Sequence, residues 1–210
     1  IRGKSSEFQI LLGGHYDTHF WGFQDDCCAV GLVLAAAKAM LDIGFEPEND
    51  IVFCLHGAEE WGSSYTQFDW TVGAWEMINT LHPEWVGKTL AFLNFELPAY
   101  EFATYTTTYS APEMFSLLRD FTTRYPYAPK PQGCFPDGVL TEGYQTYTYS
   151  DDFSYYAAGV PSTVNGFLLQ KDMAHVHPFY IDYYHTQYDT PDTYNDAVMA
   201  FNLRYYGALA

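Results

Sequence analysis

The chain has 210 residues, of which 48% are hydrophobic and 19% aromatic, so it is long enough for one sizeable core and too apolar to be disordered. Its 26 Asp and Glu residues against 9 Lys and Arg give a formal net charge of -17, which disfavours nucleic acid and anionic membrane surfaces as partners. Its apolar runs are all too short to cross a bilayer, so no membrane span is expected within this chain, and residues 1–210 are expected to form a single soluble domain.

The first half of the sequence alternates between short β-rich runs and helical segments. Three apolar runs are predicted to be strands, at residues 9–17, 51–56 and 90–95. The Ala- and Leu-rich residues 28–43 predict a helix that ends at Gly44, and residues 63–81 predict a weaker one. This alternation is typical of a parallel α/β sheet with helices on both faces, whose active site lies where the strands end.

The second half predicts fewer regular elements. The Tyr- and Thr-rich residues 97–150 surround one helical segment at 112–125, and we expect a cap or insertion over the site there. Further on, the sequence predicts a short helix at 152–158, a strand at 161–164 and a closing helix at 195–209, which follows the favourable capping residues Thr190-Pro191-Asp192. The cysteines Cys27, Cys28, Cys54 and Cys134 show no CxxC spacing, so they indicate neither a zinc ribbon nor a disulfide framework.

Two acidic motifs follow the first strand. In GGHYDT, the spacing of two places His15 and Asp17 on one face of the strand, where Asp17 can orient a metal-binding imidazole, although a capped strand end would also explain the pair. In GFQDD, the adjacent carboxylates Asp25 and Asp26 suit either the dipole of the next helix or a bridging metal ligand.

A third motif, HGAEEWG, directly follows an apolar strand. Consecutive side chains at a strand end diverge, so Glu60 can bind a metal while Glu59 reaches a metal-bound water. A solvated acidic loop is the alternative. Glu96, at the end of the strand LAFLNF, is a carboxylate that needs a partner, and His185 precedes the last helix. The remaining histidines are not predicted to be ligands: His19, His56, His82, His175 and His177.

Six blocks of this sequence resemble, in order and approximate spacing, the di-zinc aminopeptidase family (peptidase clan MH). They are GGHYDT, GFQDD, HGAEEWG, LNFE, SDDFSYYAAGVPS and YYHTQYDT, and they extend over nearly the whole chain. That family includes bacterial leucyl aminopeptidases, carboxypeptidase Q and the glutamate carboxypeptidases. The resemblance implies the zinc exopeptidase fold, a three-layer α/β/α sandwich with a mixed, mostly parallel central sheet.

The resemblance also implies a site with two Zn²⁺ ions. His15 would bind one ion and His185 the other, Asp26 would bridge them, and Glu60 and Glu96 would complete the two ligand sets. Asp25 is the alternative bridge, but counting residues from the Asp-Asp pair to Gly44 favours Asp26. Glu96 departs from the family, because many relatives have aspartate at that position.

Further roles follow from the same resemblance. Glu59 matches the general base, Asp17 the carboxylate behind the first histidine, and either Tyr147 or Tyr184 a tyrosine near the scissile carbonyl. The expected activity is hydrolysis of peptides by a metal-activated water, as an aminopeptidase, carboxypeptidase or dipeptidase.

Two other functions remain open at this stage. They are a glutaminyl-cyclase-like enzyme with a single zinc and a receptor-like domain of the same fold without metal. The resemblance favours a secreted or periplasmic location, and the sequence predicts no oligomeric state.

Overall fold

The computed structural model describes residues 1–64, 70–100, 103–125, 138–141, 150–169 and 182–210. Within these residues the strands are β1 (Gln9–His15), β2 (Asp50–His56), β3 (Thr89–Asn94), β4 (Tyr105–Ser110), β5 (Gly138–Thr141) and β6 (Ser162–Leu169). The α-helices are α1 (Cys28–Asp42), α2 (Val72–Glu76), α3 (Pro112–Arg124), α4 (Asp151–Ala157) and α6 (Asp196–Leu209). Shorter helical turns are η1 (Phe23–Cys27), η2 (Met77–Leu81), η3 (Pro83–Trp85) and η4 (Pro191–Thr193).

The strands form one mixed sheet in the order β2-β1-β3-β6-β4-β5. β1 pairs in parallel with β2 and β3, and β3 pairs in parallel with β6. β4 runs antiparallel to β6 and parallel to β5. The register places His15 beside His56, so β1 and β2 end at the same edge of the sheet. The predicted mixed, mostly parallel sheet is therefore confirmed.

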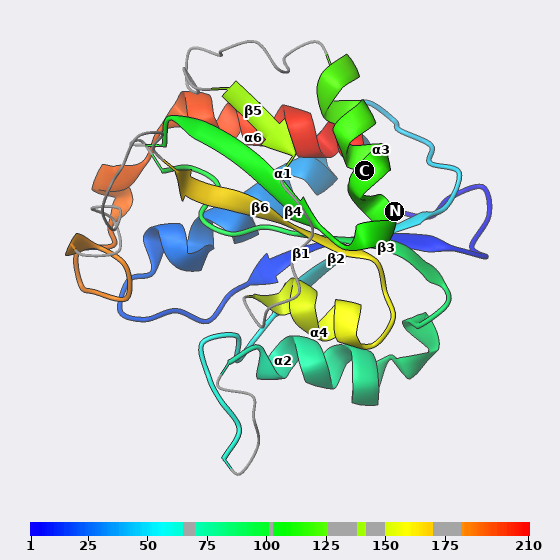
Figure 1. Cartoon of the computed structure of the whole chain (residues 1–210), viewed down its shortest axis with the longest axis horizontal. Helices are drawn as coiled ribbons and strands as arrows, with labels where there is room; N and C mark the ends of the chain where they lie inside the picture. Colours follow the sequence, from blue (N-terminus) through cyan, green and yellow to red (C-terminus); the bar gives the residue numbers. More distant parts are fainter. Residues whose placement is uncertain (65–69, 101–102, 126–137, 142–149, 170–181) are drawn as a thin grey trace.

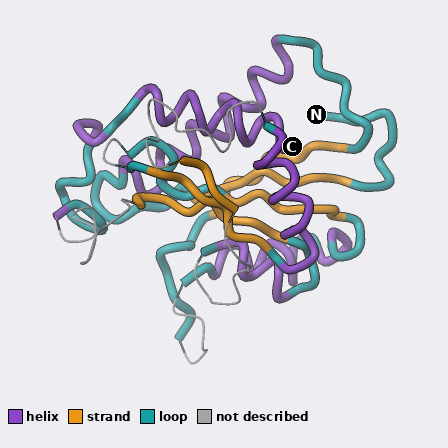
Figure 2. The backbone as a smooth tube through the Cα atoms, turned by 45° about the horizontal axis from the view of Figure 1, so that its top comes forward, coloured by secondary structure: helices purple, strands orange, loops and turns teal. Residues whose placement is uncertain are grey.

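Helices cover both faces of this sheet, as Figures 1 and 2 show. Leu11 and Leu12 are neighbours in β1 and point to opposite faces, each into its own buried cluster. Leu12 packs with residues of α1 and α6, whereas Leu11 packs with Ile78 and Tyr155 beside α2 and α4. The predicted three layers are thereby confirmed. None of the described helices is both long and apolar enough to cross a membrane.

Two regions differ from their predictions. Residues 105–110 were expected within a cap, but they form β4, an inner strand of the sheet, and β5 pairs with it. Their Tyr- and Thr-rich composition is in fact typical of strands. The helix predicted over 63–81 begins only at Val72 and continues into the π-helical turn η2, while residues 65–69 lie outside the described part.

Gly73 allows α2 to approach the turn that follows β2. A Cβ added at Gly73 would lie 1.6 Å from the main-chain oxygen of Gly57, just ahead of Glu59. We expect Gly73→Ala to destabilise the fold by about 1–3 kcal/mol, because the backbone must move to make room. Gly207→Ala in α6 is the control: its added Cβ meets no atom within 4 Å, and alanine is the better helix former. Urea unfolding measures both, and equal stabilities of the two variants would contradict this packing.

Candidate metal centre

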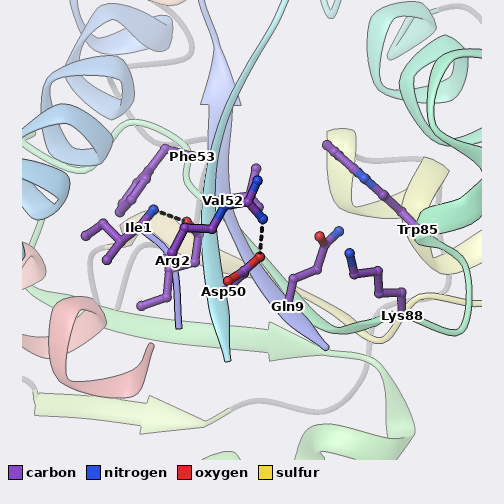
Figure 3. A pocket seen from close by; sticks show the side chains of 9 residues that line it. Ile1, Arg2, Gln9, Asp50, Val52, Phe53, Trp85 and Lys88 are labelled. Carbon is purple, nitrogen blue, oxygen red and sulfur yellow. Dashed lines mark hydrogen bonds and ion pairs between the residues drawn. The ribbon is translucent and has the colours of Figure 1, made fainter. Parts of the chain in front are cut away.

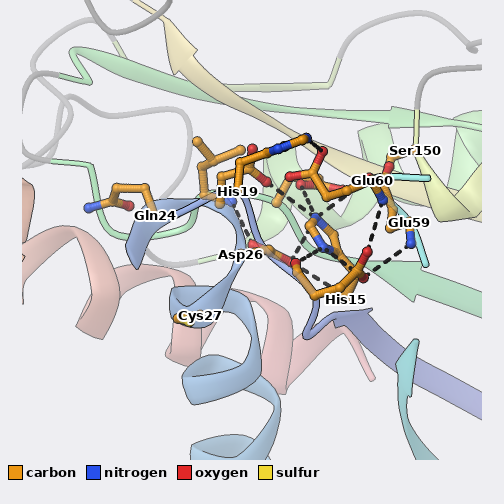
Figure 4. Close-up of polar contacts among 12 residues, drawn as sticks. His15, His19, Gln24, Asp26, Cys27, Glu59, Glu60 and Ser150 are labelled. Carbon is orange, nitrogen blue, oxygen red and sulfur yellow. Dashed lines mark hydrogen bonds and ion pairs between the residues drawn. The ribbon is translucent and has the colours of Figure 1, made fainter. Parts of the chain in front are cut away.

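The acidic and histidine motifs of the sequence meet at one edge of the sheet. His15 is the last residue of β1, Glu59 and Glu60 follow β2, and Glu96 follows β3. These three strands are neighbours and run in parallel, so their carboxyl ends lie side by side. Figure 4 shows the resulting cluster beside the start of α1.

His15 lies at the buried centre of the cluster, with a side chain that is 1% exposed. Its Nε2 atom is 3.2 Å from Asp25 Oδ1 and 3.6 Å from Glu96 Oε2. A third carboxylate oxygen, Glu59 Oε2, is 3.9 Å from the same nitrogen. His15, Asp25 and Glu96 thus form an inner group of possible metal ligands, and Asp26 borders it: one donor atom each from His15, Asp26 and Glu96 falls within 4.8 Å of the others.

His185 approaches from the segment before α6 and is more exposed, at 36%. Its Nε2 atom lies 3.0 Å from Asp25 Oδ2 and 3.1 Å from Glu60 Oε2. The two histidines predicted to hold separate ions therefore stand on either side of one carboxylate, that of Asp25. Asp25, Glu60 and His185 form an outer group.

The structure places Asp25, and not Asp26, between the two histidines, which differs from the predicted bridge. Asp26 is fully buried, and its oxygens accept main-chain N–H bonds from His15 (3.3 Å) and Leu97 (3.1 Å). Its Oδ2 is 4.0 Å from His15 Nε2. Asp26 therefore links the end of β1 to the segment that follows β3. Asp25 faces the space between the two imidazoles.

The surroundings of Asp25 and Asp26 shift the pKa values of the two carboxyls in opposite directions. Burial, together with the negative charge of Glu96, raises the pKa of the Asp26 carboxyl well above its usual value. Burial acts on Asp25 in the same direction, but contacts with His15 and His185 outweigh it, and the pKa of Asp25 is lowered. The contacts with the two histidines thus favour the ionised form of Asp25.

Asp17 contacts His15 through its main chain and, at a longer distance, through the predicted carboxylate. The Nδ1 atom of His15 lies 2.9 Å from the main-chain oxygen of Asp17 but 3.6 Å from its carboxylate. The carboxylate also accepts the main-chain N–H groups of Glu59 and Glu60, each at 3.1 Å. Asp17 therefore orients His15 through its backbone and fixes the Glu59-Glu60 turn through its side chain.

Glu59 is buried beside the inner group. Burial, and next the charge of Glu96, raises the pKa of the Glu59 carboxyl well above its usual value. None of the oxygens of Glu59 approaches an imidazole as closely as those of Asp25 do. Glu59 is thus placed near His15 without being the nearest donor to it.

Glu96 is held by polar groups that the sequence analysis did not identify. Ser150 Oγ donates a short hydrogen bond to Glu96 Oε1 and accepts one from Asn94 Nδ2 at 2.6 Å. The side chain of Asn165 accepts from the main-chain N–H of Glu96 at 2.8 Å and donates to its carbonyl at 2.7 Å. These contacts leave Glu96 Oε2 facing His15.

Asp189 is a further residue that sequence reasoning missed. Its carboxylate accepts the main-chain N–H groups of Gln24 (2.8 Å) and Asp25 (3.1 Å), so it ties the segment of His185 to that of Asp25. Its position four residues after His185 in YYHTQYDT was the available signal.

Of the two tyrosines predicted near the scissile carbonyl, the structure describes only Tyr184. Tyr184 stacks on the ring of His185, with centroids 3.7 Å apart, so it borders the cluster. Tyr147 lies outside the described residues.

His19 was predicted not to be a ligand, yet its Nε2 lies 3.2 Å from Glu60 Oε2. It follows the end of β1 by four residues, on the loop that leads to η1. This contact arises because the loop after β1 folds back over the outer group.

The cluster has the composition and spacing of a metal site. Glu60 Oε1 is buried without a hydrogen-bond partner, which is costly unless a cation lies nearby. Two donors bound to the same tetrahedral zinc stand about 3.3 Å apart, since each bond is about 2.0–2.1 Å long. The contacts of 3.2 Å at His15 and of 3.0 and 3.1 Å at His185 match this spacing. Imidazole and carboxylate donors suit zinc.

A pocket at the opposite end of β1 and β2 shows no comparable chemistry. Figure 3 shows this pocket of about 460 Å³, which is bordered by Gln9, Asp50 and Lys88. Asp50 is already satisfied, because its carboxylate accepts from Arg2, Gly3 and Ser6. The described residues around this pocket therefore offer no cluster of ligand side chains like that at the carboxyl ends of the strands.

Comparison with models of known protein families shows to which family this chain belongs. The model of peptidase family M28 matches residues 1–206. The chain belongs to peptidase family M28. The resemblance predicted from the sequence is thereby confirmed.

Solved structures show the same fold as this M28 chain. A peptidase M28 precursor from Shewanella amazonensis shares 23% identity and a TM-score of 0.70 over 99% of this chain and 42% of its own. A zinc aminopeptidase from Bacillus subtilis shares 15% identity and a TM-score of 0.74 over 99% of this chain and 47% of its own. Glutaminyl cyclase from Porphyromonas gingivalis shares 19% identity and a TM-score of 0.66 over 97% of this chain and 71% of its own.

This M28 chain thus spans less than half the length of the first two of these structures. None of the curated proteins gives a significant match.

Proposed function

We propose that this chain is the catalytic domain of a co-catalytic di-zinc exopeptidase of the aminopeptidase type. The observation that carries the proposal is the position of Asp25, whose two carboxylate oxygens face His15 and His185 separately. His15 and Glu96 would hold the inner ion, Glu60 and His185 the outer one, and Asp25 would bridge them. The bridge is therefore assigned to Asp25 in place of Asp26.

Two zinc ions, when bound, supply Lewis acidity that polarises a carbonyl and makes water a nucleophile near neutral pH. Glu59 acts as the base: it accepts a proton from the attacking water and delivers it to the nitrogen of the leaving amine. Its position supports this role, because its backbone is fixed by Asp17 and its carboxylate lies beside the inner group. Tyr184, packed on His185, is available to donate a hydrogen bond to the developing oxyanion.

The substrate would be a peptide, because the chain belongs to a peptidase family. The edge of the sheet also carries both the proposed base, Glu59, and the proposed metal ligands. Cleavage from the amino end is supported by solved relatives of the same fold that are described as aminopeptidases. The loops that would select a side chain include residues outside the described part, so the proposal names no preferred amino acid.

A panel of aminoacyl and dipeptide substrates tests this function. We expect hydrolysis of at least one aminoacyl substrate, a loss of about 100-fold or more after removal of metal by a chelator, and recovery on addition of zinc. The loss follows because Glu59 alone cannot make water a sufficient nucleophile. Hydrolysis that is insensitive to the chelator would contradict the proposal.

Glutaminyl cyclase chemistry is the second candidate, because an enzyme of that activity shares this fold over 71% of its own length. It is disfavoured by the presence of donors for two ions, with an imidazole on each side of Asp25. The two functions separate on a peptide with an amino-terminal glutamine: cyclisation without hydrolysis of any other substrate would favour the cyclase. The intact donor sets also disfavour a receptor-like domain without metal.

A further inference from the structure

His19 belongs to the outer group by position. It lies on the loop after β1, and Figure 4 shows it beside Glu60 and above the buried histidine. Its Nε2 is 3.2 Å from Glu60 Oε2, and its ring centroid is 4.3 Å from that of His185 at a tilt of 46°. Among the described residues, one donor atom each from His19, Glu60 and His185 falls within 4.8 Å of the others.

The distance between His19 Nε2 and Glu60 Oε2 fits two ligand atoms bound to the same metal ion, as well as an ion pair. Glu60 Oε2 lies between two imidazole nitrogens, at 3.2 Å from His19 and 3.1 Å from His185. Both distances are close to the separation of about 3.3 Å between donors on one tetrahedral zinc. A partly exposed ion pair, by contrast, contributes little and would not by itself hold two imidazoles on one oxygen.

The two halves of the site also differ in exposure. The inner side chains are almost fully buried, at 1% for His15 and 6% for Glu96, whereas His185 and His19 are 36% and 38% exposed. Solvent competes more effectively for an ion at the outer position. An additional imidazole there would offset this competition.

We propose that His19 is an additional protein ligand of the outer metal ion, together with Glu60, His185 and Asp25. This inference rests on the proposed di-zinc function. It assigns the outer ion two imidazoles and two carboxylates, and the inner ion one imidazole and two carboxylates. The outer ion would then owe part of its affinity to a residue that lies outside the motifs shared with the di-zinc family.

The test is a zinc titration in a chelator-buffered series, with bound zinc per chain measured by elemental analysis. His19→Ala is expected to weaken binding of the outer ion by about 10–100-fold or more, because even residues that only support a ligand have effects of this size. Binding of the inner ion should not change. Cobalt substitution gives an independent readout, since loss of an imidazole ligand changes the visible absorption of the outer ion.

Two variants complete this experiment. His82→Ala is the matched control, because His82 is also partly exposed (43%) and paired with a glutamate, Glu84, but lies away from the cluster. His185→Ala should lose the outer ion outright. If His19→Ala binds both ions as the wild type does while His185→Ala loses one, His19 is not a ligand and the di-zinc function stands. If the wild-type chain binds fewer than two ions, both proposals fail.

Discussion

Glu59→Gln is expected to lose nearly all hydrolytic turnover while keeping both zinc ions. Glutamine has almost the same shape as glutamate and can keep its place beside the inner group, but its amide cannot accept a proton from water. General base catalysis contributes about 10²–10⁴-fold, so kcat should fall by that factor. Steady-state kinetics on an aminoacyl substrate and zinc analysis of the same preparation measure the two halves of this prediction.

Glu84→Gln is the control for this experiment, since Glu84 is exposed and paired with His82 away from the site. Its turnover should match that of the wild type. Unchanged turnover of Glu59→Gln would remove Glu59 from the mechanism. Loss of zinc by Glu59→Gln would instead make Glu59 a ligand.

Asp25→Asn and Asp26→Asn are expected to behave in opposite ways although the residues are adjacent. Asp25→Asn replaces the carboxylate that faces both histidines, so zinc affinity should fall by at least about 100-fold, the upper end of the effect of residues that only support ligands. Hydrolysis at limiting zinc should fall with it. Elemental analysis after dialysis against buffered zinc measures this loss.

Asp26→Asn should keep two ions but unfold more easily. Its new amide group would face one of the two main-chain N–H donors, from His15 or Leu97, and leave that buried donor unsatisfied at a cost of about 1–3 kcal/mol. Urea unfolding of the metal-free protein isolates this effect. The reverse pattern, with zinc lost only from Asp26→Asn, would restore the bridge predicted from the sequence.

The sequence was most informative about the strands and about the polar residues at their ends. The runs at 9–17, 51–56 and 90–95 were predicted to be strands of a parallel sheet, and the structure makes them neighbours, so that the side chains at their ends meet at one edge. Hydrophobic runs determine where buried strands begin and end, and parallel pairing then determines where the polar residues meet.

The choice between Asp25 and Asp26 could not be made by counting residues. Counting from Gly44 assumes helical geometry, but the backbone at Asp25 (φ -112°, ψ 87°) and Asp26 (φ -134°, ψ 31°) is not helical. The direction of each carboxylate depends on these angles and on distant partners, namely Leu97 for Asp26 and His185 for Asp25. Neither partner is close in sequence.

The residues that support the site escaped prediction for a similar reason. Ser150 contacts Glu96 across 54 positions, and Asp189 contacts Asp25 across 164. Local patterns carry no information on such pairs. His19 is four residues from His15, but only the fold of the intervening loop brings it to Glu60.

The number and position of bound zinc ions test the central claim most directly. Crystals of the zinc-loaded chain, measured at the zinc absorption edge, would show anomalous peaks at each ion, and elemental analysis would count them. The account predicts two peaks about 3.5–4 Å apart, one on each side of the Asp25 carboxylate. A single peak, or none near Asp25, would contradict it.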